Sequence, residues 1–230
     1  DSSQLIVQTS LLVSESAVSA RAMAGDSTAS CACATVTHLL VMSLTVMSSP
    51  CETGECTLTI VPRQEWGARE PKATEPMANP VDTVVIHHTY IPPACSTVDK
   101  CEAAMRAIQN YHMDDRGWDD IGYSFAIGLD RVFEGRGWSR VGAHAPPYNR
   151  RSIGIVFIGD YMETVPSEAM LCQSRQLIDY GVSNGYIRPD YQLIGHRQAR
   201  DTLCPGDKLY ELIRTWSHWA NLPVVSYEVR

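Results

Sequence analysis

Hydrophobic residues from about residue 58 onward occur in short continuous runs that polar turns separate. The runs at 82–90 (DTVVIHHTY) and 152–160 (SIGIVFIGD) are rich in β-branched residues and predict strands buried on both faces. The segment 123–135 (YSFAIGLDRVFEG) predicts two strands around a turn at its Leu-Asp-Arg sequence. A further short strand is predicted at 191–196 (YQLIGH).

Helical patterns alternate with those strands. The segment 96–115 begins with capping residues, and its apolar residues recur at helical spacing, which predicts a helix. Residues 166–185 predict a second helix, which opens with a proline and a serine cap and closes at a glycine. A last helix is predicted over 206–220. Strands that alternate with helices indicate an α/β fold, with a central, mostly β-sheet layer and helices packed on both sides.

The predicted elements leave both ends of the chain outside the domain. Residues 1–50 are rich in Ser, Ala and Thr and hold no helical or strand period for long. We expect 1–57 to be a leader and a poorly ordered N-terminal extension, 58–222 to be one domain, and 223–230 to be a C-terminal tail.

Charge argues against a nucleic-acid partner, and hydropathy argues against a membrane-spanning segment. The 230 residues carry a formal net charge of −7, which argues against a nucleic acid held by phosphate contacts, although a local basic groove stays open. The sequence contains no apolar run long enough to span a membrane, so no transmembrane segment is predicted.

Cysteine content and one apolar window indicate secretion. Eight cysteines are many for a cytosolic enzyme and suit a compartment that permits disulfides. The window 39–47 (LLVMSLTVM) resembles the hydrophobic part of a secretory signal, although it lies far from residue 1 and lacks a basic lead-in. We therefore predict a secreted protein; whether the apolar segment is cleaved, and whether an intracellular isoform exists, stay open.

Candidate chemistry concentrates in the stretch GHRQARDTLCPG, which places His196 eight residues before Cys204. The two residues could be a buried imidazole and one half of a disulfide, which is the commoner role of each residue taken singly, or two ligands of one metal. Zinc takes imidazole nitrogen and thiolate sulfur in a tetrahedral shell, and the pair His87-His88 at the end of a predicted strand is the obvious source of a third ligand. Successive strand residues point to opposite faces, so only one of these two histidines can join. Spacing alone decides none of this.

Several motifs together carry a resemblance to a known family. They are VIHHTY, a C-x5-C pair, GWDDIGYSFAIG, VFEGRGW, GAHAPPYNRRSIGIVFIGD and LIGHRQARDTLCPGDKLYELI, and they run from about residue 60 to 219. These motifs resemble the peptidoglycan recognition proteins, which share their fold with phage-type zinc amidases, and they are most similar to the catalytic insect members of the LB type.

The resemblance implies a zinc amidase. It implies zinc ligands His87, His196 and Cys204, with Tyr123 facing the reacting centre and Thr202 at a position that active members hold as threonine or lysine. The implied reaction is hydrolysis of the amide between the lactyl group of N-acetylmuramic acid and L-alanine in bacterial peptidoglycan. Three-ligand zinc activates water near neutral pH and polarises the amide carbonyl. Tyr123 and Thr202 would assist, and the general base stays open.

Two other functions compete with the amidase. Members of the family that only bind have commonly lost the metal-binding cysteine, so retention of Cys204 favours an enzyme over a non-catalytic pattern-recognition receptor. A structural zinc protein of unrelated function is the third reading. By family analogy, the enzyme would dampen innate immune signalling by destroying its elicitor.

The resemblance also implies a groove for peptidoglycan and its muropeptides. Family positions that contact the muramyl peptide correspond to His112, Arg116, His144 and Asn149. Gly117-Trp118 matches a pair associated with meso-diaminopimelate in the stem peptide. Arg136 matches an arginine that pairs with the extra carboxylate of diaminopimelate, which a guanidinium binds in bidentate fashion. The length of glycan accepted and the oligomeric state are not predicted.

The resemblance implies a disulfide between Cys95 and Cys101. With Cys204 on zinc, five cysteines remain, an odd number that cannot pair completely. Either Cys56 or Cys51 is a possible partner of Cys172. Two others, Cys31 and Cys33, lie in the predicted leader.

Overall fold

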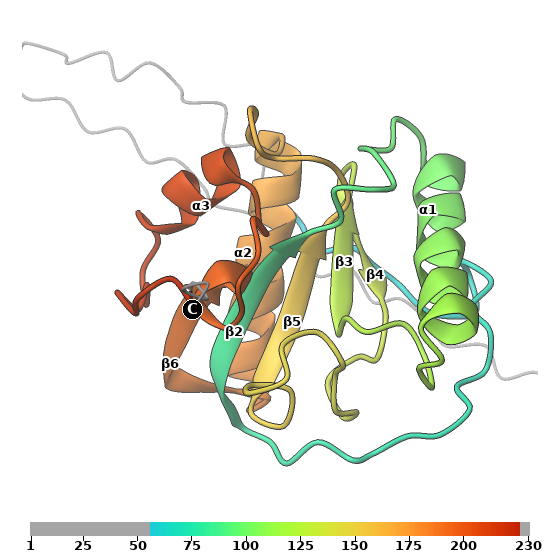
Figure 1. The fold of residues 1–230 in the computed structure, drawn as a ribbon, viewed down its shortest axis with the longest axis horizontal. Helices are drawn as coiled ribbons and strands as arrows, with labels where there is room; N and C mark the ends of the chain where they lie inside the picture. Colours follow the sequence, from blue (N-terminus) through green and yellow to red (C-terminus); the bar gives the residue numbers. More distant parts are fainter. Residues whose placement is uncertain (1–55, 226–230) are drawn as a thin grey trace, which may run out of the picture. The chain divides into compact units, whose positions relative to one another are not determined.

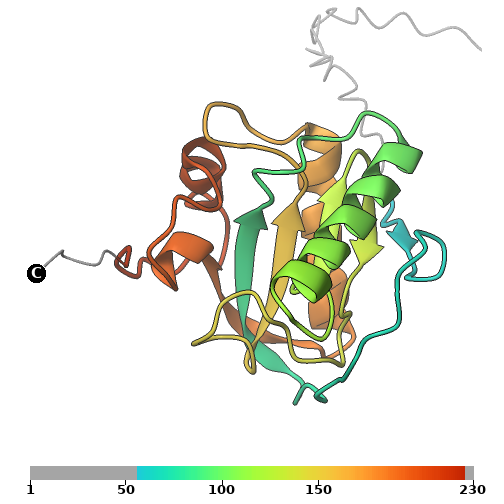
Figure 2. The same cartoon turned by 45° about the vertical axis from the view of Figure 1, so that its right-hand side comes forward.

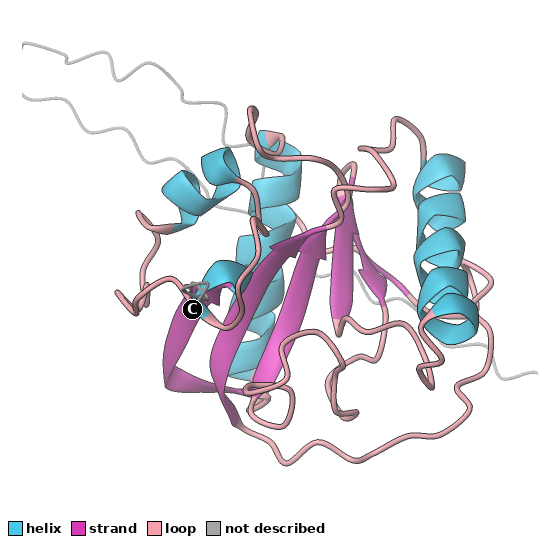
Figure 3. Cartoon of the chain, in the orientation of Figure 1, coloured by secondary structure: helices cyan, strands magenta, loops and turns pink. Residues whose placement is uncertain are grey.

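The computed structural model describes residues 56–225, which contain a six-stranded, mostly parallel sheet with helices on both faces (Figures 1 and 3). The strand order is β1-β4-β3-β5-β2-β6, and only the pair β3–β4 is antiparallel within this part of the chain. The strands are β1 (Ile60–Val61), β2 (Val81–His88), β3 (Phe125–Gly128), β4 (Arg131–Glu134), β5 (Ser152–Phe157) and β6 (Ile187–Gly195). The helices are α1 (Val98–Asn110), α2 (Glu168–Ser183) and α3 (Asp207–Ile213), with a π-helical turn η1 (Tyr111–Asp115) after α1 and a 3-10 turn η2 (His196–Gln198) after β6.

Successive side chains of a strand point to opposite faces of the sheet, so the hydrophobic core has a part on each face. On one face, Val84 and Ile86 of β2 belong to a core cluster that also contains apolar residues of α2 and α3. On the other face, Val156 and Ala126 belong to a cluster with apolar residues of α1. Figure 2 shows α1 in front of the sheet and α2 behind it. The predicted α/β fold with helices on both sides is therefore confirmed.

The central strands are buried over their whole length, as their continuous apolar runs predict. β5 is buried at all six positions, and β2 is buried at every position except Asp82. Both pair with parallel neighbours on each side, β2 with β5 and β6, and β5 with β2 and β3. Because parallel strands end at the same edge, the carboxyl ends of β2, β5 and β6 lie together.

Several predicted boundaries differ from the observed ones. The helix predicted over 206–220 ends at Ile213, because the following segment turns back to β6: Leu193 donates to the carbonyl of His218, and Ala220 donates to the carbonyl of Leu193. The α-helix predicted to reach residue 115 ends at Asn110 and continues as the π-helical turn. The strand β1 was missed, because its two residues are too short for a detectable pattern.

Two disulfides lie in the described part of the chain. One joins Cys95 to Cys101, as the resemblance implies, and the other joins Cys56 to Cys172, one of the two alternatives for Cys172. The sequence predictions for residues 1–55, including those for Cys31, Cys33 and Cys51, lie outside the described residues.

Candidate metal centre and its cavity

The register of two parallel strands brings two histidines together at the edge of the sheet. Ile86 of β2 lies opposite Gly195 of β6, so the next residue of each strand, His87 and His196, falls at the same level. Their ring centroids are 4.3 Å apart. Strand pairing explains why the two rings are neighbours although the residues are 109 positions apart in the sequence.

The loop after η2 brings Cys204 next to these two histidines. The N–H of Arg197 donates to the carbonyl of Cys204 at 3.0 Å, and the N–H of His88 donates to its Sγ at 3.4 Å. The Sγ lies 3.8 Å from Nδ1 of His87, and the potential ligand atoms of His87, His196 and Cys204 all lie within 4.8 Å of one another. The structure therefore brings together the three residues that the resemblance implies as ligands.

One glycine permits this return of the chain. Gly206 has a φ of +93°, and a Cβ at this position would lie 2.4 Å from the backbone of Tyr161. A side chain would force the loop away from that backbone, because both the left-handed conformation and the close approach favour glycine.

The second histidine of the HH pair points away from this cluster. His88 lies on the opposite face of β2, where its Nδ1 accepts from the N–H of Tyr161 at 3.2 Å. Only its backbone reaches Cys204: the N–H of His88 donates to Sγ at 3.4 Å, and its carbonyl oxygen lies 3.8 Å from Sγ. Of the two histidines, His87 alone belongs to the cluster, as the alternation of strand faces predicts.

The donor set fits a zinc ion. Burial holds the pKa of His87 well below its usual value and lowers that of His196 to about 4, so both imidazoles are neutral and carry a lone pair at neutral pH. Nε2 of His196 is buried and has no hydrogen-bond partner in the described residues, which a cation would satisfy. Burial raises the pKa of Cys204 to about 12, against the opposing effect of the His88 N–H. Two imidazoles and one thiolate are a donor set that suits zinc held by three protein ligands.

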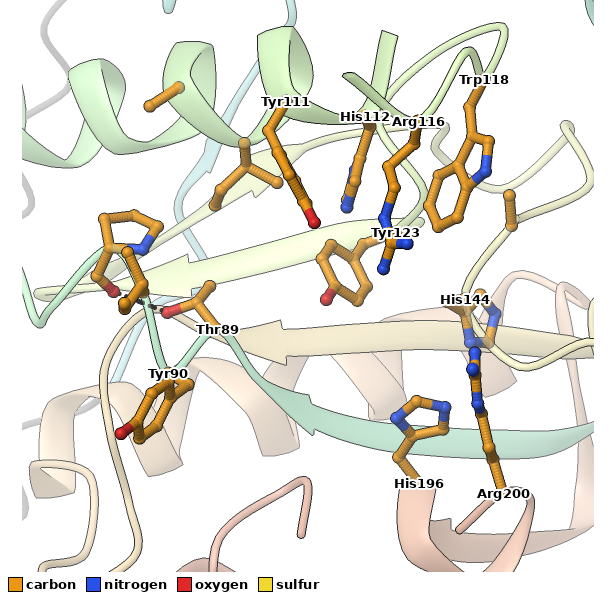
Figure 4. Close-up of a pocket in the computed structure, with 15 residues that line it drawn as sticks. Thr89, Tyr90, Tyr111, His112, Arg116, Trp118, Tyr123, His144, His196 and Arg200 are labelled. Atoms are coloured by element: carbon orange, nitrogen blue, oxygen red, sulfur yellow. Dashed lines mark hydrogen bonds between the residues drawn. The ribbon is translucent and has the colours of Figure 1, made fainter. Parts of the chain in front are cut away.

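A cavity of about 610 Å³ lies beside this cluster, and His196 is the cluster residue that lines it (Figure 4). His196 forms part of its floor, so the cluster is accessible from the cavity. The side chains predicted for substrate or catalysis that line it are His112, Arg116, Trp118, Tyr123 and His144.

The cavity wall next to α1 contains three neighbouring, mutually tilted rings, those of His112, Trp118 and Tyr123. His112 lies 4.6 Å from Trp118 and 5.6 Å from Tyr123, measured between ring centroids. Nδ1 of His112 accepts from the N–H of Gly122 at 3.0 Å, so a neutral ring carries its proton on Nε2. Burial lowers the pKa of His112 to about 4, helped by nearby Arg116. His112 is therefore a neutral hydrogen-bond donor at neutral pH.

Tyr123 stands between this wall and the metal cluster. Its ring centroid lies 5.2 Å from that of His87, and its side chain lines the cavity. Burial raises the pKa of its phenol above the usual value, and Cys204 adds to the effect. The hydroxyl is therefore protonated at neutral pH and can donate a hydrogen bond, but it is a poor base.

His144 lies beneath the cluster rather than standing free in the cavity. Its Nδ1 is 3.0 Å from Nε2 of His87, and its Nε2 is 3.4 Å from Oγ of Ser152. The ring is buried, which lowers its pKa to about 3. Both ring nitrogens thus face protein groups.

Four other predicted site residues do not line the cavity. The Oδ1 of Asn149 accepts from the N–H groups of His144 and Ala145 at 2.9 and 2.8 Å, so this side chain holds a loop instead of meeting ligand. The Oγ1 of Thr202 accepts from the N–H of Cys204 at 3.2 Å and shapes the metal-site loop.

Arg136 and Gly117 are likewise not among the residues that line the cavity. The guanidinium of Arg136 donates to the carbonyls of Ile121 and Val141, both at 2.7 Å, and does not reach the cavity in this structure. Gly117 has a φ of +69°, so it supplies the turn that presents Trp118 rather than a contact surface.

Further residues line the cavity without having been predicted. They are Thr89, Tyr90, Ile91, Pro92, Ala107, Ile108, Tyr111, Ala143 and Arg200. The first four follow β2 directly, at the carboxyl edge of the sheet where ligands of open α/β sheets bind, so their position was a usable signal. Arg200 lies four residues after the ligand His196, a spacing that one turn of chain brings to the same side.

The cavity wall carries positive charge only. Its lining includes Arg116 and Arg200 and no Asp or Glu. Neither arginine forms an ion pair within residues 56–225, and the guanidinium of Arg116 lies over the rings of Tyr111 and Trp118. A local cationic cavity in a chain of net charge −7 favours an anionic ligand.

Comparison with known proteins agrees with this site. The family model described as N-acetylmuramoyl-L-alanine amidase matches residues 77–207. Peptidoglycan-recognition protein LB of Drosophila melanogaster is 46% identical over 170 residues, which cover 74% of this chain and 73% of the relative. The human N-acetylmuramoyl-L-alanine amidase is 45% identical over 164 residues, but these span only 28% of that longer protein.

Solved structures show the same fold. The wild-type Drosophila LB protein superposes with a TM-score of 0.71 and 46% identity, covering 73% of this chain and 99% of the solved one. Peptidoglycan recognition protein-LE was solved in complex with tracheal cytotoxin, a monomeric diaminopimelic acid-type peptidoglycan. It gives a TM-score of 0.69 and 42% identity, covering 71% of this chain and 96% of the solved one.

Proposed function

Because this chain belongs to the N-acetylmuramoyl-L-alanine amidase family, among its peptidoglycan recognition proteins, we propose that it is a zinc-dependent amidase of bacterial peptidoglycan. It hydrolyses the amide between the lactyl group of N-acetylmuramic acid and L-alanine, in peptidoglycan of the diaminopimelate type. The observation that carries this proposal is the convergence of potential ligand atoms of His87, His196 and Cys204 within 4.8 Å, in a cluster whose His196 lines the cavity.

The three ligand residues would hold the zinc ion. His87 and His196 offer neutral imidazoles, and Cys204 offers a thiolate once the cation displaces its proton. When bound, zinc with three protein ligands supplies Lewis-acid polarisation of an amide carbonyl and a water nucleophile that is active near neutral pH. The N–H of His88 stabilises the negative charge on Sγ of Cys204.

Tyr123 is the proposed catalytic residue beside the metal. Its protonated hydroxyl faces the cavity and would donate to the amide oxygen as negative charge develops there. In the reaction the C–N bond breaks, the water oxygen becomes part of the lactyl carboxylate, and both protons of the water pass to the leaving nitrogen, which becomes the ammonium group of L-alanine. Preorganised donors matter most in such a shielded site, because they need no reorientation during the reaction.

The cavity wall would bind the stem peptide. Diaminopimelate-type stems carry several carboxylates, and Arg116 and Arg200 are the cationic side chains available to them. Trp118 and Tyr111 offer flat apolar surfaces beside the Arg116 guanidinium. The LE relative solved with a diaminopimelic acid-type muropeptide supports the choice of this stem type.

We further propose that the protein acts outside the cell. Two disulfides in the described residues support an oxidising compartment. Cleavage of the lactyl amide separates glycan from peptide, so the activity would remove a muropeptide signal and dampen innate immune signalling.

The test is the release of free peptide stems from purified diaminopimelate-type peptidoglycan, followed by mass spectrometry. The full chain is expected to release stems with a new amine on L-alanine, to lose this activity with a zinc chelator and to recover it with added zinc. Tight binding without any release, with zinc present, would show a non-catalytic receptor instead.

A further inference from the structure

A chain of hydrogen bonds leads from a backbone carbonyl to the metal ligand His87. It begins at Ser152, the first residue of β5, whose Oγ donates to the carbonyl of Tyr148 at 2.9 Å. A carbonyl oxygen can only accept, so this bond commits the single proton of the serine hydroxyl. The same Oγ must then act as the acceptor toward Nε2 of His144, which lies at 3.4 Å.

The direction of the next bond follows from this one. A neutral imidazole carries a single ring proton. If that proton is on Nε2, Nδ1 has a free lone pair and acts as a hydrogen-bond acceptor. His144 is buried and makes no ion pair with a carboxylate in the described residues, so a cationic ring would be strongly disfavoured there. Its Nδ1 therefore accepts the proton of Nε2 of His87 at 3.0 Å.

The chain ends by fixing the tautomer of His87. With its proton on Nε2, this ring is left with a lone pair on Nδ1, the nitrogen that lies 3.8 Å from Sγ of Cys204. The opposite tautomer would place a proton where the cation must bind. Hydrogen bonding at one ring nitrogen is the usual way in which a protein sets the ligating nitrogen of a histidine.

Two glycines leave room for the His144 ring beneath His87. A Cβ on Gly154 would lie 2.5 Å from Cδ2 of the His144 ring, and a Cβ on Gly142 would lie equally close. Asn149 holds the backbone at His144 by accepting its N–H. Two glycines and one side-chain bond thus fix the ring beneath His87.

We propose that His144 is a positioning residue for zinc: with Ser152 and the carbonyl of Tyr148, it forms a directional relay that holds His87 in the tautomer with Nδ1 free for the metal. This assignment differs from the sequence-based expectation of a substrate contact, because both ring nitrogens are engaged by the protein. It rests on the proposed zinc site, whose ligands are His87, His196 and Cys204.

Zinc affinity of the full chain, measured by competition with a chromophoric chelator, tests the relay without any substrate. His144→Leu removes the acceptor and is expected to weaken zinc binding about 10- to 100-fold, the range for lost partners of metal-ligating histidines. His144→Asn places an amide oxygen near the position of Nδ1 and is expected to recover most of the loss. Cobalt substitution gives a second readout, because the visible spectrum of a thiolate–cobalt site reports its geometry.

A variant away from the ligands keeps the test independent of folding. Ser152→Ala removes the acceptor that keeps the proton of His144 on Nε2. It is therefore expected to weaken zinc binding, but by less than His144→Leu does. Ser174→Ala is the matched control, because Ser174 is also buried and also donates to a backbone carbonyl, that of Leu171 at 2.7 Å in α2. The control is expected to leave zinc affinity unchanged.

The outcomes separate the relay from other roles of His144. A folded His144→Leu protein with unaltered zinc affinity would overturn the proposal, as would His144→Asn that binds zinc as weakly as His144→Leu. If His144→Leu does not fold, equal zinc affinity of Ser152→Ala and Ser174→Ala would overturn it. A raised KM with unchanged zinc affinity would return His144 to a substrate contact. Failure of the proposed function looks different: wild-type protein would bind zinc with the predicted variant pattern and release no peptide stems.

Discussion

The backbone N–H of His88 points at Sγ of Cys204 across 3.4 Å, although 116 residues separate them in the sequence. The end of β2 therefore contributes twice to one site: His87 supplies an imidazole, and the next residue supplies a hydrogen bond to the sulfur. Parallel pairing with β6 adds His196 at the same edge. The metal site is thus a product of sheet topology.

Substitution of Cys204 by serine tests the ligand assignment. Cys204→Ser is expected to abolish hydrolysis and to lower zinc content to near zero, because a serine hydroxyl is a much poorer zinc ligand than a thiolate. The protein should stay folded and still bind peptidoglycan, since the cavity wall is unchanged. Metal analysis and a pull-down with insoluble peptidoglycan check both parts; hydrolysis at the wild-type rate would refute the assignment.

Removal of the Tyr123 hydroxyl isolates its proposed role as a donor. Tyr123→Phe is expected to lower kcat about 10²- to 10³-fold, the usual cost of one lost donor to a developing oxyanion. Zinc affinity and KM should change little, because the ring itself remains. Tyr90→Phe is a suitable control, since Tyr90 also lines the cavity but lies 57% exposed. Equal effects in the two variants would contradict the role.

The two cavity arginines are expected to act mainly on binding. Arg200→Gln should raise KM for a diaminopimelate-type muropeptide about 10- to 150-fold, because a hydrogen bond between charged groups contributes about 1.5–3 kcal/mol. Arg116→Gln should act in the same direction. Arg188→Gln on β6 is the control, because Arg188 is exposed and paired with Asp190. An unchanged KM in both cavity variants would show that the stem peptide lies elsewhere.

Buried neutral histidines predict how the metal-free protein responds to acid. The folded-state pKa values of His112 and His144 are about 4 and 3, below the unfolded value near 6.5. The unfolded state therefore binds more protons below about pH 6.5, and the free energy of unfolding falls as the pH drops from there toward 4. Each imidazole contributes up to about 1.4 kcal/mol per pH unit in this window.

Urea unfolding of the zinc-free protein at pH 7 and pH 5 measures this dependence. His112→Gln removes one of the groups and is expected to reduce the loss of stability between the two pH values. His218→Gln is the matched control, because His218 stacks on Tyr191 outside the cavity. The same loss in wild type and His112→Gln would show that His112 is not buried in neutral form.

Sequence patterns predicted five of the six strands and the main helices, and the family resemblance supplied the three residues of the metal cluster. Continuous apolar runs at β2 and β5 are a strong signal, because strands buried on both faces need apolar residues at every position. The ligand set came from the resemblance of whole motifs, since the spacing of His196 and Cys204 alone was equally compatible with a disulfide. Geometry then selected His87 over His88 through the alternation of strand faces.

Side-chain roles were harder to predict than positions. Arg136 and Asn149 were expected to meet ligand, but backbone groups that no linear pattern reveals engage both side chains. His144 lines the cavity as expected, but its two ring nitrogens also face His87 and Ser152, a contact between distant segments that the sequence does not reveal. Such roles depend on contacts between distant segments.

X-ray absorption at the zinc K edge of the purified full chain tests the central claim most directly. The ligand set of His87, His196 and Cys204 predicts one sulfur at about 2.3 Å and nitrogen or oxygen neighbours at about 2.0–2.1 Å. Cys204→Ser measured with excess zinc is expected to show no sulfur shell around whatever zinc it binds. A zinc-loaded wild-type protein with no sulfur neighbour, or the same spectrum in both proteins, would contradict it.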